Sequence, residues 1–408
     1  MVHYHASWVV PIAGPPIRDG WVTLDAGRIG GVSDRPPIDS TSASVDLGHV
    51  AIFPGLVNAH THLELSYLDA KVAPASDFVT WVRGVMSARR GHPHPASPEI
   101  VEAIDRAIAQ AVSCGTAVLG DITNSLVTFE PLVRSPLAAL VFYELIGFNA
   151  PDPRGFVERA RAEIAALGSA ERVRPCLAPH APYSVAPEVF AAIGEAVDGD
   201  ASAVCSVHLS ESVEECDFIR GGQGPWKQVL EQVGAWNPRW TPPGCSPVQF
   251  LESIGFLGPR LLAVHGVQMG PDDLERLAAH GTTLVTCPRS NAHTGAGSPP
   301  VAAFYRSGVP VAVGTDSLAS APDLNIFGEL AALRRLAPDV AASRLLESAT
   351  SVGARALGFS DEYGTIEPGK RSRLLAVDLP ASLPVTVEAV EEYLVSGIGP
   401  ERLRWLSE

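Results

Sequence analysis

The chain has 408 residues, of which 46% are hydrophobic and 18% are charged, and its formal net charge is −15. This length suits one large domain with an appendage, and the composition is that of a globular rather than a disordered protein. The negative balance argues against nucleic acids and membranes as partners, which leaves a small molecule as the expected ligand. Because no signal peptide, membrane-spanning run or paired cysteine spacing is recognisable, we expect a cytoplasmic protein.

The two ends of the chain have the character of short strands separated by turn residues. The expected strands at these ends are residues 7–11, 20–24, 28–32 and 374–378. We expect residues 1–50 and 362–408 to combine into one small β-sandwich domain.

Between these ends, residues 51–361 alternate between apolar strands and helices. The expected strands are residues 51–59, 116–121, 137–144, 173–179, 203–208, 261–265, 283–287 and 311–315. The expected helices include residues 98–113, 154–167, 187–197, 271–280 and 325–336. Strands that are apolar throughout and alternate with helices predict an α/β fold, a (β/α)8 TIM-type barrel.

One stretch of this segment, residues 221–244, is rich in glycine, proline and tryptophan and is long for a barrel loop. Long loops in compact domains usually serve as lids or interfaces, and the sequence leaves both interpretations open. Its residues Trp226, Trp236 and Trp240 either cap an aromatic ligand or bury a contact between subunits. We expect a homo-oligomer, a dimer.

Polar residues stand at the carboxyl ends of the expected barrel strands, where barrel enzymes place their chemistry. They are His60, His62, His180, His208, His265, Asn291 and Asp316. Side chains two apart on a strand face the same way, so His60 and His62 suit one metal ion. With His208 and Asp316 they form our expected ligand set, three imidazoles and a carboxylate that leave a water position open. Each residue alone reads more simply as a core histidine or a capping aspartate, but together they predict a site.

Two further residues have the position and chemistry to move protons beside this metal. Glu211 stands three residues after His208 and suits a proton carrier outside the ligand set. The alternative for Glu211 is a capping-box glutamate that opens the next helix after Ser210. We expect His265 to act electrostatically beside the metal and not as a ligand.

Other polar and aromatic residues near the strand ends allow two interpretations each. Glu64 and Glu144 suit either substrate hydroxyls or buried structural pairing. At helical spacing, Phe78 and Trp81 either line the pocket or pack the helix on the barrel. The pair Arg89-Arg90 is expected to be a solvated helix end.

At these motifs the chain resembles the amidohydrolase superfamily, in its cytosine deaminase-like branch of metal-dependent aminohydrolases. The similar segments are residues 54–62, 208–211, 264–266, 287–291, 314–317 and 364–370. The resemblance implies a (β/α)8 barrel, a β-sandwich from both termini, and a hydrolase of non-peptide C–N bonds. It also implies one Zn2+ per chain, with Fe2+ in some members. No lysine suited to bridging two metals follows the fourth strand, so we expect a single-metal site.

The resemblance further implies catalytic roles for Glu211, His265 and Asp316. Asp316 accepts a proton of the attacking water, His265 orients that water toward the substrate, and Glu211 protonates a ring nitrogen. Protonation makes the adjacent ring carbon electrophilic, and the amino group then leaves as ammonia.

For the substrate, residues 60–68 look like those of aminodeoxyfutalosine deaminases of menaquinone biosynthesis, and residues 179–184 resemble a nucleoside-binding motif. We expect deamination of 6-aminodeoxyfutalosine. The expected substrate-binding residues are His180, Glu64, Trp81, Asn291 and Ser317. The alternatives are a deaminase of S-adenosylhomocysteine, methylthioadenosine, adenosine, guanine or cytosine, a triazine-type chlorohydrolase, or a non-catalytic barrel scaffold.

One departure bears on that choice. Adenosine-type deaminases of this branch typically carry a ribose-binding glutamate shortly before a tryptophan, whereas residues 77–81 read Asp-Phe-Val-Thr-Trp. This difference counts against an unmodified purine nucleoside, with Asp77 as an uncertain substitute for the glutamate.

Overall fold

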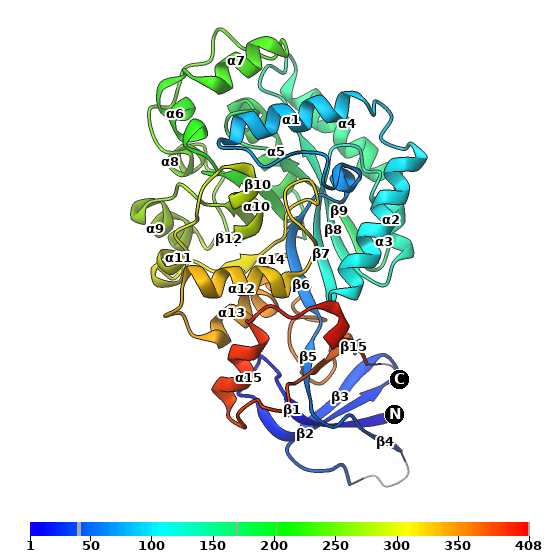
Figure 1. The fold of residues 1–408 in the computed structure, drawn as a ribbon. Coiled ribbons are helices and arrows are strands. Elements are labelled where there is room, and N and C mark those ends of the chain that lie inside the picture. Colours follow the sequence, from blue (N-terminus) through cyan, green and yellow to red (C-terminus); the bar gives the residue numbers. More distant parts are fainter. Residues whose placement is uncertain (39–41, 169, 201, 407–408) are drawn as a thin grey trace.

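The computed structural model describes residues 1–38, 42–168, 170–200 and 202–406. A barrel of parallel strands with surrounding helices forms its upper part in Figure 1, and a mixed sheet containing both chain ends lies below it. The expected α/β barrel with a smaller β-structure from both termini is therefore confirmed.

The barrel consists of two four-stranded parallel sheets, in the orders β6-β7-β8-β9 and β10-β11-β12-β13. The strands are β6 (Leu56–Thr61), β7 (Thr116–Thr123), β8 (Ala138–Leu145), β9 (Val173–Pro179), β10 (Cys205–Leu209), β11 (Leu261–His265), β12 (Thr283–Thr286) and β13 (Val311–Val313). Backbone bonds join the two sheets at both seams, from His208 N to His180 O (2.8 Å) and from Asp316 N to His60 O (3.0 Å). The carboxyl ends of all eight strands thus surround one opening.

The expected barrel helices form within a residue or two of their expected bounds. They are α2 (Pro98–Ser113), α4 (Pro153–Ala166), α5 (Pro187–Asp198), α9 (Pro271–His280) and α12 (Ile326–Leu336). The first four begin at a proline, which lacks the N–H that a first helical residue leaves unpaired. The remaining helices are η1 (Leu63–Leu68), α1 (Phe78–Arg90), α3 (Phe129–Arg134), α6 (Val213–Gly221), α7 (Pro225–Gln232), α8 (Pro247–Ser253), α10 (Pro288–Thr294), α11 (Val301–Ser307), α13 (Ala342–Ser348), α14 (Ser351–Ala356), α15 (Val387–Leu394) and η2 (Pro400–Arg402).

The mixed sheet has seven strands in the order β15-β14-β5-β1-β2-β3, with β4 also paired to β1. Its strands are β1 (Val2–Val9), β2 (Ile17–Asp25), β3 (Arg28–Ser33), β4 (Ala43–Asp46), β5 (Val50–Pro54), β14 (Leu374–Asp378) and β15 (Leu403–Trp405). It has its own apolar cluster, in which Val22, Leu24 and Ile52 are fully buried. In the described residues the two chain ends thus form one mixed sheet rather than two facing sheets.

Gly55 divides the expected strand 51–59 between the two parts of the molecule. Residues before it form β5 in the mixed sheet, and residues after it form β6 in the barrel. A Cβ atom on Gly55 would lie 2.6 Å from the Cβ of Ala117 and 3.0 Å from the carbonyl oxygen of Arg373, so only glycine fits there. The chain thus passes from the mixed sheet to the barrel at Gly55.

Among the residues that the structure describes, no helix is both long enough and apolar enough to cross a bilayer. All six cysteines are free thiols, and Cys114, Cys205 and Cys287 are buried. Burial raises the pKa of the Cys114 thiol to about 11, which keeps it protonated and unreactive.

Candidate active site

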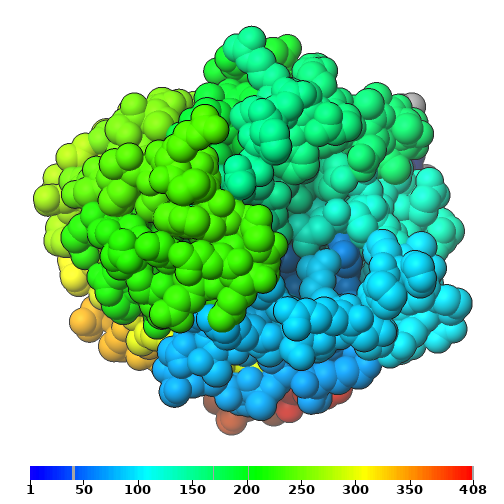
Figure 2. Space-filling view, turned by 90° about the horizontal axis from the view of Figure 1, so that it is seen from above, coloured from blue at the N-terminus to red at the C-terminus, as the bar shows by residue number. Residues whose placement is uncertain are grey.

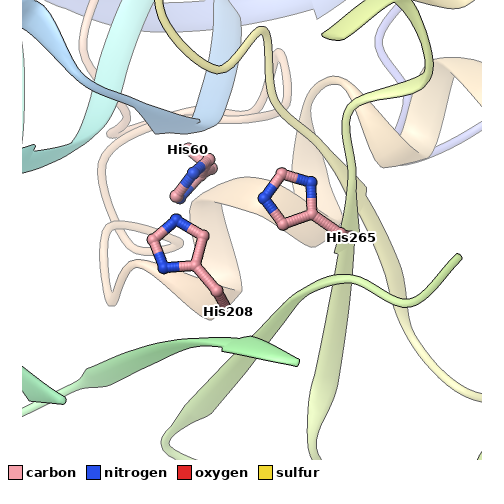
Figure 3. Close-up of side chains that lie close together, drawn as sticks. All are labelled: His60, His208 and His265. Carbon is pink, nitrogen blue, oxygen red and sulfur yellow. The ribbon is translucent and has the colours of Figure 1, made fainter. Parts of the chain in front are cut away.

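The four expected metal ligands converge at the carboxyl ends of β6, β10 and β13. Nε2 of His62 lies 3.3 Å from Nε2 of His208. Oδ1 of Asp316 lies 3.5 Å from Nε2 of His62 and 3.8 Å from Nε2 of His60. Figure 3 shows the rings of His60, His208 and His265 turned toward one another from three strands. Ring nitrogens and a carboxylate oxygen therefore face a common point.

The chemistry of this cluster fits a divalent cation. Both ring nitrogens of His60 are buried without a hydrogen-bond partner among the described residues, which is costly for a polar group unless a ligand pairs with it. Burial and neighbouring imidazoles hold the pKa values of His60 and His62 well below their ordinary value. The rings are therefore neutral, which is the form that binds metal. Three imidazoles and a carboxylate form a donor set that suits Zn2+.

Hydrogen bonds fix the orientation of the Asp316 carboxylate. Its Oδ2 accepts from Ser290 Oγ (2.5 Å) and Ser320 Oγ (3.1 Å), while Oδ1 accepts from the backbone N of Ser317 (2.8 Å). Oδ1 is the oxygen nearest the histidines, so the serines hold the carboxylate with that atom toward the cluster. The sequence interpretation missed Ser290 and Ser320, because nothing in their spacing shows which carboxylate they reach.

The backbone is strained at three non-glycine residues of this face. Ser210, His265 and Asp316 have φ values of +52°, +78° and +60°. Side chains other than glycine rarely adopt such conformations, which cost on the order of 1–3 kcal/mol each and cluster at active sites. These three residues stand at or just after the ends of three barrel strands, where the fold maintains the strained conformations at a cost to its stability.

Glu211 and His265 form a pair beside the cluster. Oε1 of Glu211 lies 3.4 Å from Nε2 of His265, whose Nδ1 lies 2.9 Å from Oδ1 of Asn291. Burial, with the charges of Asp316 and Glu215, raises the pKa of Glu211 well above its ordinary value. The carboxyl group can therefore hold a proton at neutral pH and donate it.

The capping alternative for Glu211 does not apply, because Ser212 caps α6 by accepting from the backbone N of Glu215. Glu215 is itself buried and accepts the backbone N–H groups of Ser210 (3.0 Å) and Glu211 (2.8 Å). It thereby holds the strained turn that presents Glu211. No spacing signal in the sequence distinguishes this role of Glu215 from that of an ordinary residue in the first turn of a helix.

A cavity of about 470 Å3 opens above the cluster. In Figure 2 this face of the molecule is hollowed between the segment that contains α1 and the segment that contains α6 and α7. His62, His208, His265, Glu211 and Asp316 all line the cavity. Its volume lies in the usual range for small-molecule sites.

Comparison with known proteins places the chain in a family. The model of the amidohydrolase family matches residues 51–397. The chain belongs to the amidohydrolase family. The aminodeoxyfutalosine deaminase of Deinococcus radiodurans is 30% identical over 336 residues, which cover 78% of this chain and 75% of that protein.

A 5-methylthioadenosine/S-adenosylhomocysteine deaminase of Nitratidesulfovibrio vulgaris is 28% identical over 381 residues, covering 90% of this chain and 80% of that protein. A crystal structure of an adenosine deaminase from Xanthomonas campestris with bound zinc has a TM-score of 0.81 and 28% identity, covering 98% and 90% of the two chains. The expectation that this amidohydrolase is a hydrolase of non-peptide C–N bonds is confirmed. Zinc is present in a related structure, and this chain has the His and Asp cluster to hold one.

Three of the expected substrate-binding residues line the cavity of this amidohydrolase. Nδ1 of His180 lies 2.6 Å from Oγ of Ser184, and burial lowers the pKa of His180 to about 4, so the ring is neutral. The indole Nε1 of Trp81 is buried without a partner among the described residues. Ser317 lines the cavity beside Asp316.

The other two expected substrate-binding residues, Asn291 and Glu64, are not among the cavity-lining residues. Asn291 is fully buried, and its Oδ1 faces Nδ1 of His265, where it orients the imidazole. Glu64 accepts from Thr123 Oγ1 (2.5 Å) and the backbone N of Asn124 (2.8 Å). Glu64 is thus held by protein partners on both oxygens, whereas Nδ2 of Asn291 has no partner among the described residues, and substrate contacts of these two side chains stay a prediction.

Arg89 is not the solvated helix end that its place beside Arg90 suggested. Its guanidinium donates to Oε1 of Glu64 (3.1 Å) and Oδ1 of Asn124 (3.0 Å), and its side chain lines the cavity. The helical spacing held a usable signal, because Trp81, residue 85 and Arg89 follow one another at intervals of four on one face of α1. All three line the cavity.

The other open alternatives near the mouth are also resolved. Asp77 caps α1 by accepting from the backbone N of Thr80 (2.8 Å) and does not line the cavity, so it does not replace a ribose-binding glutamate. Phe78 and Trp81 both pack in the core and line the cavity. Glu144 lines it too, with Oε1 3.4 Å from Nδ1 of His208.

The stretch 221–244 contains the helix α7 instead of being irregular throughout. Trp226 stacks on Tyr183 with ring centroids 3.9 Å apart, and both line the cavity. Trp236 and Trp240 pack on Phe148 instead, at 5.9 and 5.3 Å between centroids. These contacts lie within the chain, so neither a subunit interface nor an exposed aromatic cap is needed to explain them.

Proposed function

We propose that this amidohydrolase is a Zn2+-dependent deaminase of an adenine-type nucleoside and that its substrate is 6-aminodeoxyfutalosine. The observation that carries the proposal is the pair of Glu211 and His265 beside the neutral imidazoles and Asp316, at the base of the cavity. The related deaminase of Deinococcus radiodurans supports the choice of substrate.

His60, His62, His208 and Asp316 would hold the metal ion, which supplies Lewis acidity that makes water nucleophilic near neutral pH. The protonated carboxyl of Glu211 donates its proton to a ring nitrogen of the substrate, which makes the neighbouring carbon electrophilic. Oδ1 of Asp316 accepts a proton from the attacking water, and His265, fixed by Asn291, orients that water. Asp316 then passes this proton to the amino group, the C–N bond breaks and ammonia leaves, while the hydroxyl group added to the carbon returns a proton to Glu211 as the carbonyl forms.

The rest of the cavity fits a nucleoside better than a free base. Neutral His180 presents a ring nitrogen to the cavity for a ribose oxygen, while its other nitrogen faces Ser184. The unpartnered indole N–H of Trp81 is a second hydrogen-bond donor for the same ligand. A free guanine or cytosine base would leave these groups unpaired, which is costly in a buried site.

The main alternative is deamination of methylthioadenosine or S-adenosylhomocysteine, the substrates in the name of the relative from Nitratidesulfovibrio vulgaris. Chlorohydrolysis is less favoured, because Glu211 and His265 together provide for protonation of a ring nitrogen and a departing amine. A non-catalytic scaffold would be expected to lose metal ligands, whereas this chain keeps all four expected ones, with Asp316 within 3.8 Å of His60 and His62, and His62 3.3 Å from His208.

Ammonia release from a panel of substrates tests the proposal. The purified zinc-loaded protein is assayed with 6-aminodeoxyfutalosine, methylthioadenosine, S-adenosylhomocysteine, adenosine, guanine and cytosine. We expect the highest kcat/KM for the first compound. If it is inert while another compound turns over, the substrate assignment is wrong and the deaminase assignment stands; if none turns over, both are wrong.

We also propose that the reaction takes place in the cytoplasm, in keeping with six cysteines that are all free thiols in this structure. The homodimer remains a prediction, which light scattering of the purified protein tests.

A further inference from the structure

The cavity continues past the metal cluster toward a second, more open hollow of about 630 Å3 beside α1. The two hollows share six lining residues, namely Met86, Arg89, Asn124, Glu144, Ile146 and Val233. A ligand whose reacting end lies at His208 can therefore extend through this shared wall to the outside. Nothing in the proposed chemistry accounts for the residues that stand there.

The shared wall carries a cation with unused hydrogen-bonding capacity. Arg89 donates to Glu64 and Asn124, and these are two of the five N–H groups of a planar guanidinium. Its side chain is 36% exposed, whereas that of Glu64 is 5% exposed and is also held by Thr123. The cation therefore faces the hollow, and its carboxylate partner lies behind it.

The charges around Arg89 favour an anion at this place. Arg90 lines the second hollow as an additional cation, in a protein whose net charge is −15. Glu144 is engaged on both oxygens, by Asn124 Nδ2 (2.8 Å) and His208 Nδ1 (3.4 Å).

The wall around Arg89 is apolar and partly uncovered. Ile146 and Val233 are 55% and 48% exposed, among the few large hydrophobic side chains that reach the surface. With Met86 they line both hollows, and Phe156 lines the outer one. Exposed apolar side chains grouped at the mouth of a site indicate a ligand segment that covers them.

We propose that Arg89 binds a carboxylate at the far end of the substrate and that Met86, Ile146 and Val233 contact an aromatic segment between this carboxylate and the nucleoside. The inference rests on the proposed function, because it takes the amino-bearing ring to lie at the metal cluster. It distinguishes an aryl-carboxylate nucleoside from one with a methylthio group, which offers Arg89 no anion. An amino-acid tail would bring an ammonium group toward Arg89 and Arg90.

The arrangement along the wall supports this direction of binding. Contacts lead from the metal cluster to the cation: His208 to Glu144 (3.4 Å), Glu144 to Asn124 (2.8 Å) and Asn124 to Arg89 (3.0 Å). His180 lines the same cavity, with its ring centroid 4.9 Å from that of His208, and it is the residue proposed above to bind the ribose. A 5′ substituent that leaves the ribose toward α1 therefore meets Arg89.

The test compares substrates with and without the carboxylate on zinc-loaded Arg89→Met, Arg89→Lys and unaltered protein. The substrates are 6-aminodeoxyfutalosine, whose 5′ chain ends in a benzoate, its methyl ester, and methylthioadenosine. We expect Arg89→Met to lower kcat/KM for the free acid by about 100-fold, the effect of losing a charge-assisted hydrogen-bond pair. For the ester and methylthioadenosine we expect less than about a threefold change, and Arg89→Lys should restore part of the loss.

Arg83→Met is the matched control, because Arg83 lies on the same helix, is exposed and donates to Gln232 without lining either hollow. It should leave all three substrates unchanged. Equal losses on all substrates in Arg89→Met would show that Arg89 only supports the fold and would overturn the proposal. A preference of the unaltered protein for the ester over the acid would overturn it without any variant.

A binding measurement separates this proposal from the proposed function. Calorimetry with the deaminated benzoate nucleoside should give a Kd about 100-fold higher for Arg89→Met than for unaltered protein. If this difference appears but no adenine nucleoside releases ammonia, the proposed function fails and the carboxylate site stands. If the two proteins bind this nucleoside equally well, the carboxylate site is wrong whatever the turnover shows.

Discussion

The two ends of the cavity are built in different ways. At the inner end, side chains from strand ends are almost fully buried and are fixed by partners, as Asp316 is by Ser290 and Ser320. At the mouth, the lining comes from α1 and loop segments, and Ile146 and Val233 are about half exposed. The proposed reaction chemistry thus lies on the barrel strands, whereas the proposed recognition of the substrate's far end lies on α1 and loop segments, which typically vary more than the barrel.

This division implies that substitutions at the inner end remove turnover with every substrate, whereas substitutions at the mouth discriminate between substrates. This contrast would be contradicted if substitutions at the mouth lowered turnover of all substrates equally. It would also be contradicted if substitutions at the inner end lowered turnover of only some substrates. The following variants test the inner end, from the largest expected effect to the smallest.

His62→Ala has the largest expected effect. Its side chain is 13% exposed, against 0% for His60, so its removal disturbs packing less while still deleting a proposed ligand. We expect metal affinity to fall by at least about 100-fold and ammonia release to be lost for all substrates. Elemental analysis and activity measure this, with exposed His94→Ala as the control. Full metal content in His62→Ala would contradict the ligand assignment.

Glu211→Gln separates proton transfer from metal binding. The amide keeps the shape of the carboxyl but cannot donate an acidic proton, so kcat should fall by about 10³-fold while metal content stays unchanged. Glu214→Gln, a neighbour that does not line the cavity, should retain full activity. Unimpaired turnover in Glu211→Gln would remove the proton-carrier role.

Glu215→Ala should have an intermediate effect, because Glu215 acts through the turn that carries Glu211. We expect kcat to fall by about 10- to 100-fold with unchanged metal content. Glu215→Gln keeps one acceptor oxygen for the two backbone N–H groups and should recover part of the loss. Similar kcat values for both variants and the unaltered protein would show that the turn holds without Glu215.

Asp121→Asn should have the smallest effect on turnover, less than about threefold, but a clear effect on stability. Oδ1 of Asp121 accepts from the backbone N of Leu63, while Oδ2 is buried without a partner among the described residues. Burial raises the pKa of Asp121 from 3.8 to about 7. The folded protein therefore favours the protonated carboxyl.

The raised pKa of Asp121 determines how the free energy of unfolding changes with pH. The free energy of unfolding of the unaltered protein should fall as the pH rises from about 4 to about 7, because folding then requires uptake of a proton or burial of a charge. The asparagine variant lacks this dependence, so its relative stability should rise over the same interval. Urea unfolding at equal metal loading measures the difference. Parallel curves for both proteins would contradict the assignment.

Much of the fold could be predicted because the sequence pattern follows burial directly. β9, β11, α2 and α9 have the expected bounds, since their apolar runs and initial prolines are local signals. The break at Gly55 could not be predicted, because the clash that requires glycine involves Ala117 and Arg373 from distant parts of the chain.

Part of the site was also predictable from local sequence signals. The convergence of His60, His62, His208 and Asp316 followed from their places at strand ends, which the barrel brings together. The roles of Asn291, Glu64 and Arg89 depended instead on which side chain reaches which partner. Such pairing is fixed by tertiary geometry, and a position in the sequence does not indicate it.

The crossing at Gly55 has a consequence for how the protein is synthesised. β5 pairs on one side with β1, which precedes it closely in the chain, and on the other with β14, close to the chain's end. During translation, the β14 side of β5 therefore stays unpaired until almost the whole barrel has left the ribosome. An open strand edge is a site for pairing with other chains. The β14 side of β5 is thus open to pairing with other strands until β14 has been synthesised.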